Sequence, residues 1–219
     1  MAQKIVYMSL TIVTSMGIVM LPRITNIFSK GDMKKVNGYL IKTFNFASYV
    51  SIPMMFGLMS ISTGFSLWFF GSEFIKSGTI MMIESPILVL IGWSNVIGIQ
   101  YMLPLGKSNE LTLSVTIGAI IDIIANLLLI KSLFSIGAAI STVLAELTVV
   151  AIQMYLMRNE LPVKEMFKDI WKYFLDGLIM YLTISLFSKV FGFSFLIMII
   201  QIATAIIIYF IMLLILKSN

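Results

Sequence analysis

About seven apolar blocks, each close to the length of a membrane-spanning helix, constrain what this chain can fold into. About 20 helical residues cross the roughly 30 Å hydrocarbon layer of a bilayer. Residues 117–130 (IGAIIDIIANLLLI) are almost continuously aliphatic and lack the period-two alternation of a barrel strand. The blocks are therefore predicted to be helices, at residues 5–21, 39–60, 79–101, 111–130, 136–157, 173–190 and 193–216.

The composition also indicates a protein of the bilayer. Hydrophobic residues make up 59% of the 219 residues and charged residues 11%, whereas a soluble domain carries roughly 25% charged residues because water covers its surface. We therefore expect an all-α, polytopic membrane helical bundle of about seven transmembrane helices in the cell membrane. Residues 1–219 would form this one bundle.

The chain has neither cysteine nor histidine. Disulfides, thiolate nucleophiles, imidazole bases and the usual ligands of transition metals are therefore excluded. We predict no catalytic residue, no metal site and no cofactor. The net charge of +5 could suggest nucleic acid, but the basic residues lie in short loops between the apolar blocks, which is typical of topology signals.

Lysine and arginine are unevenly divided between the two sides of the predicted bundle. One side holds ten of them and the other four, which identifies the first side as cytoplasmic. An odd number of spans then puts the N-terminus outside, yet nothing ahead of the first block resembles a cleavable signal peptide, so we expect part of a longer protein. The ten are Arg23, Lys30, Lys34, Lys35, Lys107, Arg158, Lys164, Lys168, Lys172 and Lys217, and the four are Lys4, Lys76, Lys131 and Lys189.

Two predicted cytoplasmic segments carry local signals. In residues 161–172, apolar side chains recur at helical spacing opposite charged ones. This pattern favours a helix lying on the inner membrane surface, with a plain connector as the alternative. Residues 29–32 (SKGD) end in Asp32, which suits the cap of a helix beginning near Met33. Lys42 would then lie about two turns inside the second span.

Several short motifs, taken in order along the chain, are similar to those of one transporter family. They are LPRI at 21–24 with SKGD at 29–32, GWSNVIGIQ at 92–100 running into LPLGK at 103–107, NLLLI at 126–130, and IGAAI at 136–140 followed by Glu146. These stretches resemble the loop after the eighth helix, and the tenth to twelfth helices, of oligosaccharide and polysaccharide repeat-unit flippases. Those flippases form part of the multidrug/oligosaccharidyl-lipid/polysaccharide exporter superfamily. The resemblance covers this chain and the C-terminal half of a family member.

The resemblance implies two pseudo-symmetric helical bundles around a central cavity, with both termini in the cytoplasm. A chain that starts in the eighth helix would then have an odd number of spans. Either a longer reading frame or a partner chain would supply the first bundle. The implied cargo is an undecaprenyl-pyrophosphate-linked oligosaccharide, carried across by alternating access during surface polysaccharide biosynthesis.

An acid in the fourth predicted span is the first candidate for a functional site. Ser114, Gly118, Asp122 and Asn126 recur every four residues, so they share one helix face that should point into the bundle or a watery cavity. An acid near mid-bilayer costs about 2.5 to 3.5 kcal/mol on insertion scales, which the aliphatic residues of the span can offset. Asp122 is predicted to bind a cation or a proton, with a hydrogen bond to a neighbouring helix as the alternative.

Other polar residues of the spans have both a functional and a packing interpretation. Glu146 lies mid-way along the fifth span beside small residues, which favours a packing role. Asn95 and Gln100 could bind sugar hydroxyls, although packing is favoured. Glu84 is expected at a solvated end of the third span. Lys42 could hold a pyrophosphate, or extend its side chain to the inner headgroups.

These features favour a flippase for lipid-linked oligosaccharides over an enzyme. A membrane polysaccharide polymerase or glycosyltransferase needs a long extramembrane loop or clustered acids and bases, whereas here the loops are short and the acids dispersed. A cation-coupled multidrug antiporter of the same superfamily is the main alternative. The predicted partners are the lipid-linked oligosaccharide, the lipid bilayer and a chain that supplies the other half, with no nucleic acid.

Overall fold

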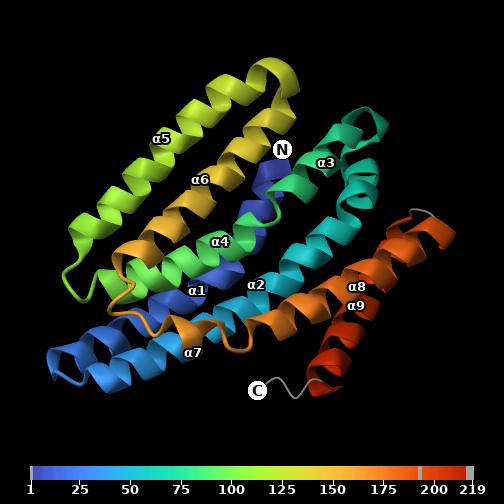
Figure 1. Cartoon of the computed structure of the whole chain (residues 1–219). Helices are drawn as coiled ribbons and strands as arrows, with labels where there is room; N and C mark the ends of the chain where they lie inside the picture. Colours follow the sequence, from blue (N-terminus) through green and yellow to red (C-terminus); the bar gives the residue numbers. More distant parts are fainter. Residues whose placement is uncertain (1, 192–193, 216–219) are drawn as a thin grey trace.

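The computed structural model describes residues 2–191 and 194–215, and every regular element within these ranges is a helix, as predicted. In chain order the elements are α1 (Ala2–Ser29), α2 (Met33–Phe70), the 3-10 turn η1 (Ser72–Phe74), α3 (Ile75–Glu84), α4 (Ile87–Ser94), the π-helix η2 (Asn95–Met102), α5 (Ser108–Leu133), α6 (Ser135–Leu156), α7 (Val163–Phe167), α8 (Ile170–Phe191) and α9 (Phe195–Ile215). Figure 1 shows a bundle with the α5–α6 hairpin at one edge and α8 with α9 at the other.

Six segments of the described chain are long and apolar enough to cross a membrane, and α9 contains a seventh, shorter apolar helix, Leu196–Tyr209. This agrees with the prediction of about seven spans. Residues 193 and 216, the limits of the last predicted span, lie outside the described residues. The six segments are Gln3–Ser29, Met33–Phe70, Ile75–Met102, Ser108–Leu133, Ser135–Leu156 and Val163–Ser188.

The second helix is the central element of the bundle. With 38 residues, α2 extends beyond the predicted block at both ends, and it contacts α1, α3, α4, α8 and α9. Its start confirms the predicted cap, because Asp32 Oδ1 accepts a hydrogen bond of 3.1 Å from the amide of Lys35. The ammonium of Lys35 also lies 2.8 Å from the same carboxylate. These two interactions hold the pKa of Asp32 below its usual value.

The third crossing is broken between α3 and α4 at Ser85 and Pro86. Glu84, the last residue of α3, is only 4% exposed, so the expectation of a solvated end is wrong. The crossing begins at Ile75, which places Glu84 about 14 Å along the helix axis at about 1.5 Å per residue. At the same level α3 lies directly against α2, since a Cβ on Gly78 would be 2.9 Å from the main-chain oxygen of Ser62.

Helices α5 and α6 form a tight hairpin. A Cβ on Gly118 of α5 would lie 2.4 Å from Cγ2 of Val149 and 3.2 Å from the main-chain oxygen of Ala145, both on α6. Ser114 is likewise fully buried. The face shared by Ser114 and Gly118 therefore points into the bundle, as the four-residue spacing predicted. The opposite face of α5 exposes large aliphatic side chains such as Leu127 and Leu128.

The segment 161–172 does not form the predicted surface helix. Helix α7 covers only Val163–Phe167, and a turn at 168–169 leads into α8. Met166 is fully buried, and the ring of Phe167 lies 5.3 Å from those of Phe44 and Trp93. The apolar side chains of α7 thus pack against α2 and α4 rather than against lipid, because those helices offer an aromatic surface at this end of the bundle.

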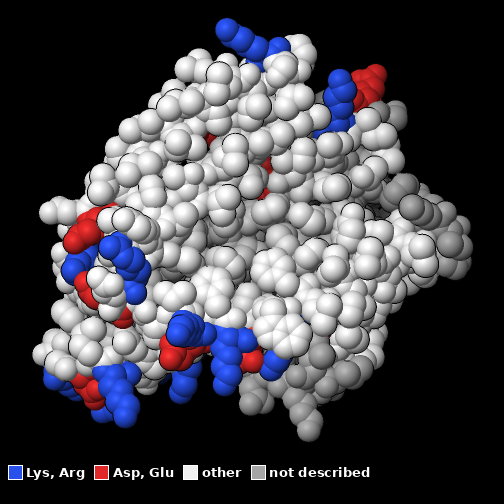
Figure 2. Space-filling view, in the orientation of Figure 1, with Lys and Arg blue, Asp and Glu red and all other residues white. Residues whose placement is uncertain are grey.

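Positive charge gathers at one end of the molecule. Figure 2 shows most lysine and arginine side chains along the lower part of the bundle, with a broad uncharged surface above them and a few charges at the upper end. The lower end carries the α1–α2, η2–α5 and α6–α8 connections. This distribution matches the charge count that identified the cytoplasmic side. Lys217 lies outside the described residues.

Candidate functional site

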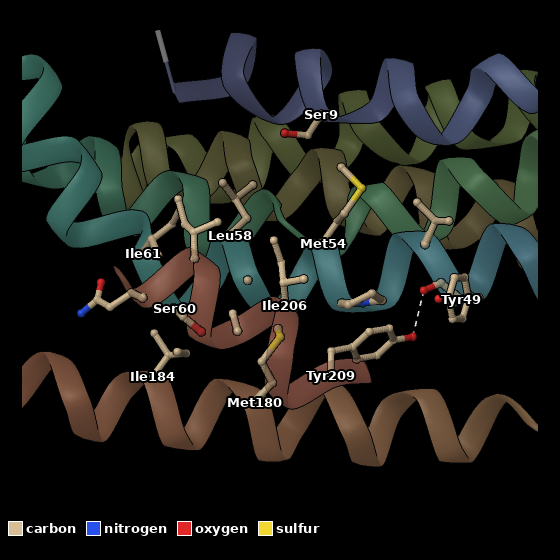
Figure 3. A pocket seen from close by; sticks show the side chains of 16 residues that line it. Ser9, Tyr49, Met54, Leu58, Ser60, Ile61, Met180, Ile184, Ile206 and Tyr209 are labelled. Atoms are coloured by element: carbon tan, nitrogen blue, oxygen red, sulfur yellow. Dashed lines mark hydrogen bonds between the residues drawn. The ribbon is translucent and has the colours of Figure 1, made fainter. Parts of the chain in front are cut away.

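An apolar pocket of about 480 Å³ lies between α2, α8 and α9, with Ser9 of α1 also lining it. Figure 3 shows Met180 and Ile184 extending from α8 toward the other helices, with Ile206 of α9 in the centre. Most of the lining side chains are aliphatic. The pocket therefore offers a surface suited to a hydrocarbon chain.

A second pocket of about 350 Å³ is more polar and adjoins the first. It is lined by Lys42, Asn45, Phe46, Tyr49 and Tyr173. Tyr49 lines both pockets, so the two spaces meet at this residue. The predicted candidate Lys42 is thus exposed at a pocket with an amide and two tyrosines. Asn45 Oδ1 is buried and lacks a hydrogen-bond donor in the described part of the chain.

A hydrogen bond between α9 and α2 marks the place where the pockets meet. The phenol of Tyr209 donates a 2.9 Å hydrogen bond to the main-chain oxygen of Tyr49 (Figure 3). In a regular helix that oxygen would accept from the amide four residues later, but this residue is Pro53, which has no N–H. The phenol therefore replaces the missing helix bond. The two rings lie 5.8 Å apart.

Asp176 of α8 is a buried acid that sequence reasoning missed. It is 0% exposed, and neither of its carboxylate oxygens has a hydrogen-bond partner among the residues described. Asp176 lies one helical turn from both Tyr173 and Met180, which line the two pockets, and its charge acts on Tyr209. A single acid within the apolar block 173–190 was the signal that could have identified it.

The predicted acids lie in a different part of the bundle. Glu84 of α3, Asp122 of α5 and Glu146 of α6 all act electrostatically on Tyr7 of α1, and Asp122 also acts on Glu146. Asp122 and Glu146 are partly buried. Within the described chain, Glu84 Oε2 and Asp122 Oδ1 are buried without a hydrogen-bond partner. The structure thus brings Asp122 and Glu146 into one electrostatic environment and adds Glu84 to it.

Asn126 does not extend this group of acids through its side-chain amide. Its Nδ2 donates a 2.9 Å hydrogen bond to the main-chain oxygen of Asp122, within the same helix. A geometric search of the described residues finds no three acids placed to hold a metal ion together. The acids therefore suit a proton or a weakly held monovalent cation better than a multidentate metal site.

The candidate amides Asn95 and Gln100 bond to each other. Gln100 Nε2 donates a 3.0 Å hydrogen bond to Asn95 Oδ1, across the five-residue spacing that a π-helix brings into register. Nearby, Gln153 Nε2 donates a 3.0 Å hydrogen bond to Ser94 Oγ and so joins α6 to α4. Gln100 is only 1% exposed. This placement favours the packing interpretation of both amides.

Comparison with known proteins gives one relative and one related structure. No family model matches the chain. It is 27% identical over 145 residues to the lipid II flippase MurJ of Bacillus subtilis (strain 168), which covers 65% of this chain and 26% of that protein. A solved structure, the lipid II flippase MurJ in an inward closed conformation, matches with a TM-score of 0.82 at 22% identity, over 96% of this chain and 44% of that chain.

These matches refine the resemblance drawn from the motifs. The chain shares its fold with less than half of a solved flippase, and it is a multi-pass protein of the cell membrane. Both matched proteins are lipid II flippases, whereas the motifs suggested flippases of polysaccharide repeat units. The chain spans about a quarter of the length of the curated relative.

Proposed function

We propose that this chain forms one bundle of a transporter that moves a lipid-linked saccharide precursor across the cell membrane by alternating access. The observation that carries the proposal is the pair of adjoining pockets that meet at Tyr49. One pocket is apolar, and the other presents the ammonium of Lys42 and the amide of Asn45. An amphiphile with a hydrocarbon chain and an anionic diphosphate head has the same order of apolar and charged parts.

The physical requirement for such a transporter is the cost of taking the head group through hydrocarbon. Charged and hydroxylated groups lose their hydration in a medium that returns no hydrogen bonds. A polar cavity between two bundles replaces water for the head, while the lipid chain stays on apolar surface. The second bundle would belong to the same polypeptide or to a partner chain.

Two cargoes of this class are proposed in order. Lipid II comes first, since the relative and the related structure both carry the name of a lipid II flippase. An oligosaccharide repeat unit of a surface polysaccharide comes second, since the motifs at 21–24, 29–32 and 92–100 resemble those of repeat-unit flippases. Both are lipid-linked saccharides, so the two pockets suit either one.

We assign coupling of transport to an ion to Asp122 and Glu146. The two carboxylates come from neighbouring helices and act on each other electrostatically. A proton or a monovalent cation between them would relieve their repulsion. Asp122→Asn should therefore weaken the dependence of transport on the ion gradient while leaving cargo binding intact. Equal gradient dependence in Asp122→Asn and the parent would refute this role.

The function is tested by removing the chain from cells. Depletion should cause the lipid-linked precursor to accumulate on the inner leaflet, and re-expression of the parent should reverse the accumulation. Lipid II and surface-polysaccharide repeat units are quantified separately, so the accumulating species identifies the cargo. Normal levels of both precursors after depletion would reject the flippase proposal.

The role of Lys42 is tested by binding to the purified protein. Lys42→Gln removes a charge-assisted hydrogen bond worth about 1.5–3 kcal/mol, which corresponds to roughly tenfold or more weaker binding of the diphosphate lipid. Lys30→Gln is the matched control, because Lys30 is exposed in the α1–α2 connection. Equal losses in the two variants would indicate nonspecific attraction to positive charge instead of a site at Lys42.

A further inference from the structure

Asp176 lies at a close contact between helices. A Cβ on its neighbour Gly177 would be 2.3 Å from Cδ2 of Phe56, so α8 and α2 touch at this level. Asp176 itself is 0% exposed, and it lies on the same side of α8 as Tyr173 and Met180. A search over all described residues gives no hydrogen-bond donor for Oδ1 or Oδ2.

The groups that face Asp176 offer acceptors and phenols but little positive charge. From α2 these are Tyr49 and Lys42, from α8 Tyr173, and from α9 Tyr209. On α7, the adjacent element, Lys164 and Glu165 are exposed and turn away from the bundle. The hydroxyl of Tyr209 already donates to the oxygen of Tyr49, and phenols with an ordinary pKa of about 10 are neutral at pH 7.

Two lysines that could neutralise Asp176 do not do so in this arrangement. Lys172 pairs with Asp169 at 2.7 Å, and Lys42 is exposed at the polar pocket. No ion pair within 4.0 Å joins Asp176 to a lysine or arginine in the described ranges. An ionised carboxylate that is buried without donor or counter-ion costs several kcal/mol or more, so such a group neutralises or rearranges its surroundings.

We propose that Asp176 is a proton-binding site whose occupancy holds α8 against α2 and α9 around the apolar pocket. With the proton bound, the carboxyl is neutral and can stay buried. Loss of the proton leaves an unpaired carboxylate, and α8 then separates from α2 to admit water or the ammonium of Lys42. The polar pocket provides the path for the proton, because it connects the exposed Lys42 with Tyr173, one turn from Asp176. This site is separate from the acids at Asp122 and Glu146 and does not depend on the cargo.

Infrared difference spectroscopy of the full chain in lipid nanodiscs tests the proton directly. A protonated carboxylic acid gives a C=O stretching band that the carboxylate lacks. The parent should show at neutral pH a component of this band that is missing in Asp176→Asn and that disappears from the parent at alkaline pH. Asp122→Asn and Glu146→Gln should leave this component unchanged. Spectra of the parent and Asp176→Asn that coincide in this region at every pH would overturn the proposal.

The coupling to helix position is tested with spin labels, since the chain contains no cysteine of its own. Thr63→Cys on α2 and Thr183→Cys on α8 place labels at exposed positions. In the parent the distance between labels should lengthen as the pH rises, whereas in Asp176→Asn it should stay short at every pH. A parent distance that does not respond to pH, or an equal response in Asp176→Asn, would overturn the coupling.

Two further arms separate other outcomes. If sodium at constant pH shifts the label distance in the parent and not in Asp176→Asn, the site binds a metal cation and the proton assignment is wrong. Asp176→Leu provides a second neutral variant, and both neutral variants should remain folded at alkaline pH at least as well as the parent. Failure of both to fold where the parent folds would show that the charge itself is required. None of these readouts uses transport, so they remain decisive if the transport proposal fails.

Discussion

The phenol of Tyr209 lies 2.9 Å from the main-chain oxygen of Tyr49, across a sequence separation of 160 residues. This oxygen has lost its helical partner because Pro53 stands four residues later. Helix α9 is therefore fastened to α2 at the one turn where α2 cannot complete its own hydrogen bonding. The same turn separates the apolar pocket from the polar one.

Replacing Tyr209 with phenylalanine should leave the Tyr49 oxygen without a donor. A buried polar group that loses its partner costs about 1–3 kcal/mol of unfolding free energy. Pro53→Ala restores an amide at that turn, so Tyr209→Phe should cost clearly less in a Pro53→Ala background. The measurement is a double-mutant cycle of unfolding in detergent. An equal cost in both backgrounds would contradict the link between Pro53 and Tyr209.

The contact between α5 and α6 should depend on the absence of a side chain at position 118. Gly118→Ala would put a Cβ 2.4 Å from Cγ2 of Val149, and overpacking of this kind typically costs about 1–3 kcal/mol. Val149→Ala removes the blocking methyl and should reduce that cost. Gly38→Ala is the control, because no atom lies within 4 Å of a Cβ there and a helical alanine is favoured by roughly 0.5–1 kcal/mol. Thermal unfolding in micelles ranks these variants, and equal stability of Gly118→Ala and Gly38→Ala would count against the contact.

Burial of Glu84 predicts an unusual response to substitution. Glu84→Gln keeps the shape and removes a charge from a site where Oε2 finds no hydrogen-bond partner in the described chain, so thermal stability should be unchanged or higher. Glu84→Lys should be strongly destabilising, because it places a longer cation in the same enclosed space. Glu73 is exposed, and both substitutions there should have little effect. Similar results at the two positions would mean that Glu84 is solvated.

Lys107 should keep the two cytoplasmic connections together at neutral pH and release them in strong alkali. Its ammonium lies 2.9 Å from Glu160 Oε1, and this carboxylate raises the pKa of Lys107 above 10.5. A raised pKa means that the stabilisation is complete below the ordinary lysine value and is lost as the pH rises through the raised one. Hydrogen exchange at the amides of Glu160 and Leu161, compared between the parent and Lys107→Met, should differ at pH 8 and converge in strong alkali. A difference that persists in alkali would show that the lysine stem, not its charge, makes the contact.

Features that depend on local spacing could be predicted from the sequence. The apolar blocks gave helices, Asp32 caps α2, and the four-residue recurrence placed Ser114 and Gly118 on the inward face of α5. Features that depend on contacts between distant segments could not. Glu84 is buried because α3 lies against α2, and Met166 is buried because aromatic residues of α2 and α4 cover α7.

The candidate site shows the same division. Lys42, Asp122 and Glu146 could be selected because each is a charge within an apolar block. Asp176 met the same criterion, but its position close to the charged end of its block made it look like part of the cytoplasmic connection. Its isolation becomes apparent only when α2 and α9 are in place. The pockets likewise require helices that are far apart in sequence.

The α5–α6 hairpin turns through a single residue, Phe134, whose φ is 50°, and Gly118 brings its two arms into contact. Such a hairpin swings as one rigid lever. Asp122 and Glu146 ride on this lever and keep a constant spacing, whereas Glu84 stays behind on α3. Any tilt of the lever therefore alters the field of Glu84 at the other two acids, so that the affinity of the pair for a cation would report the angle of the hairpin.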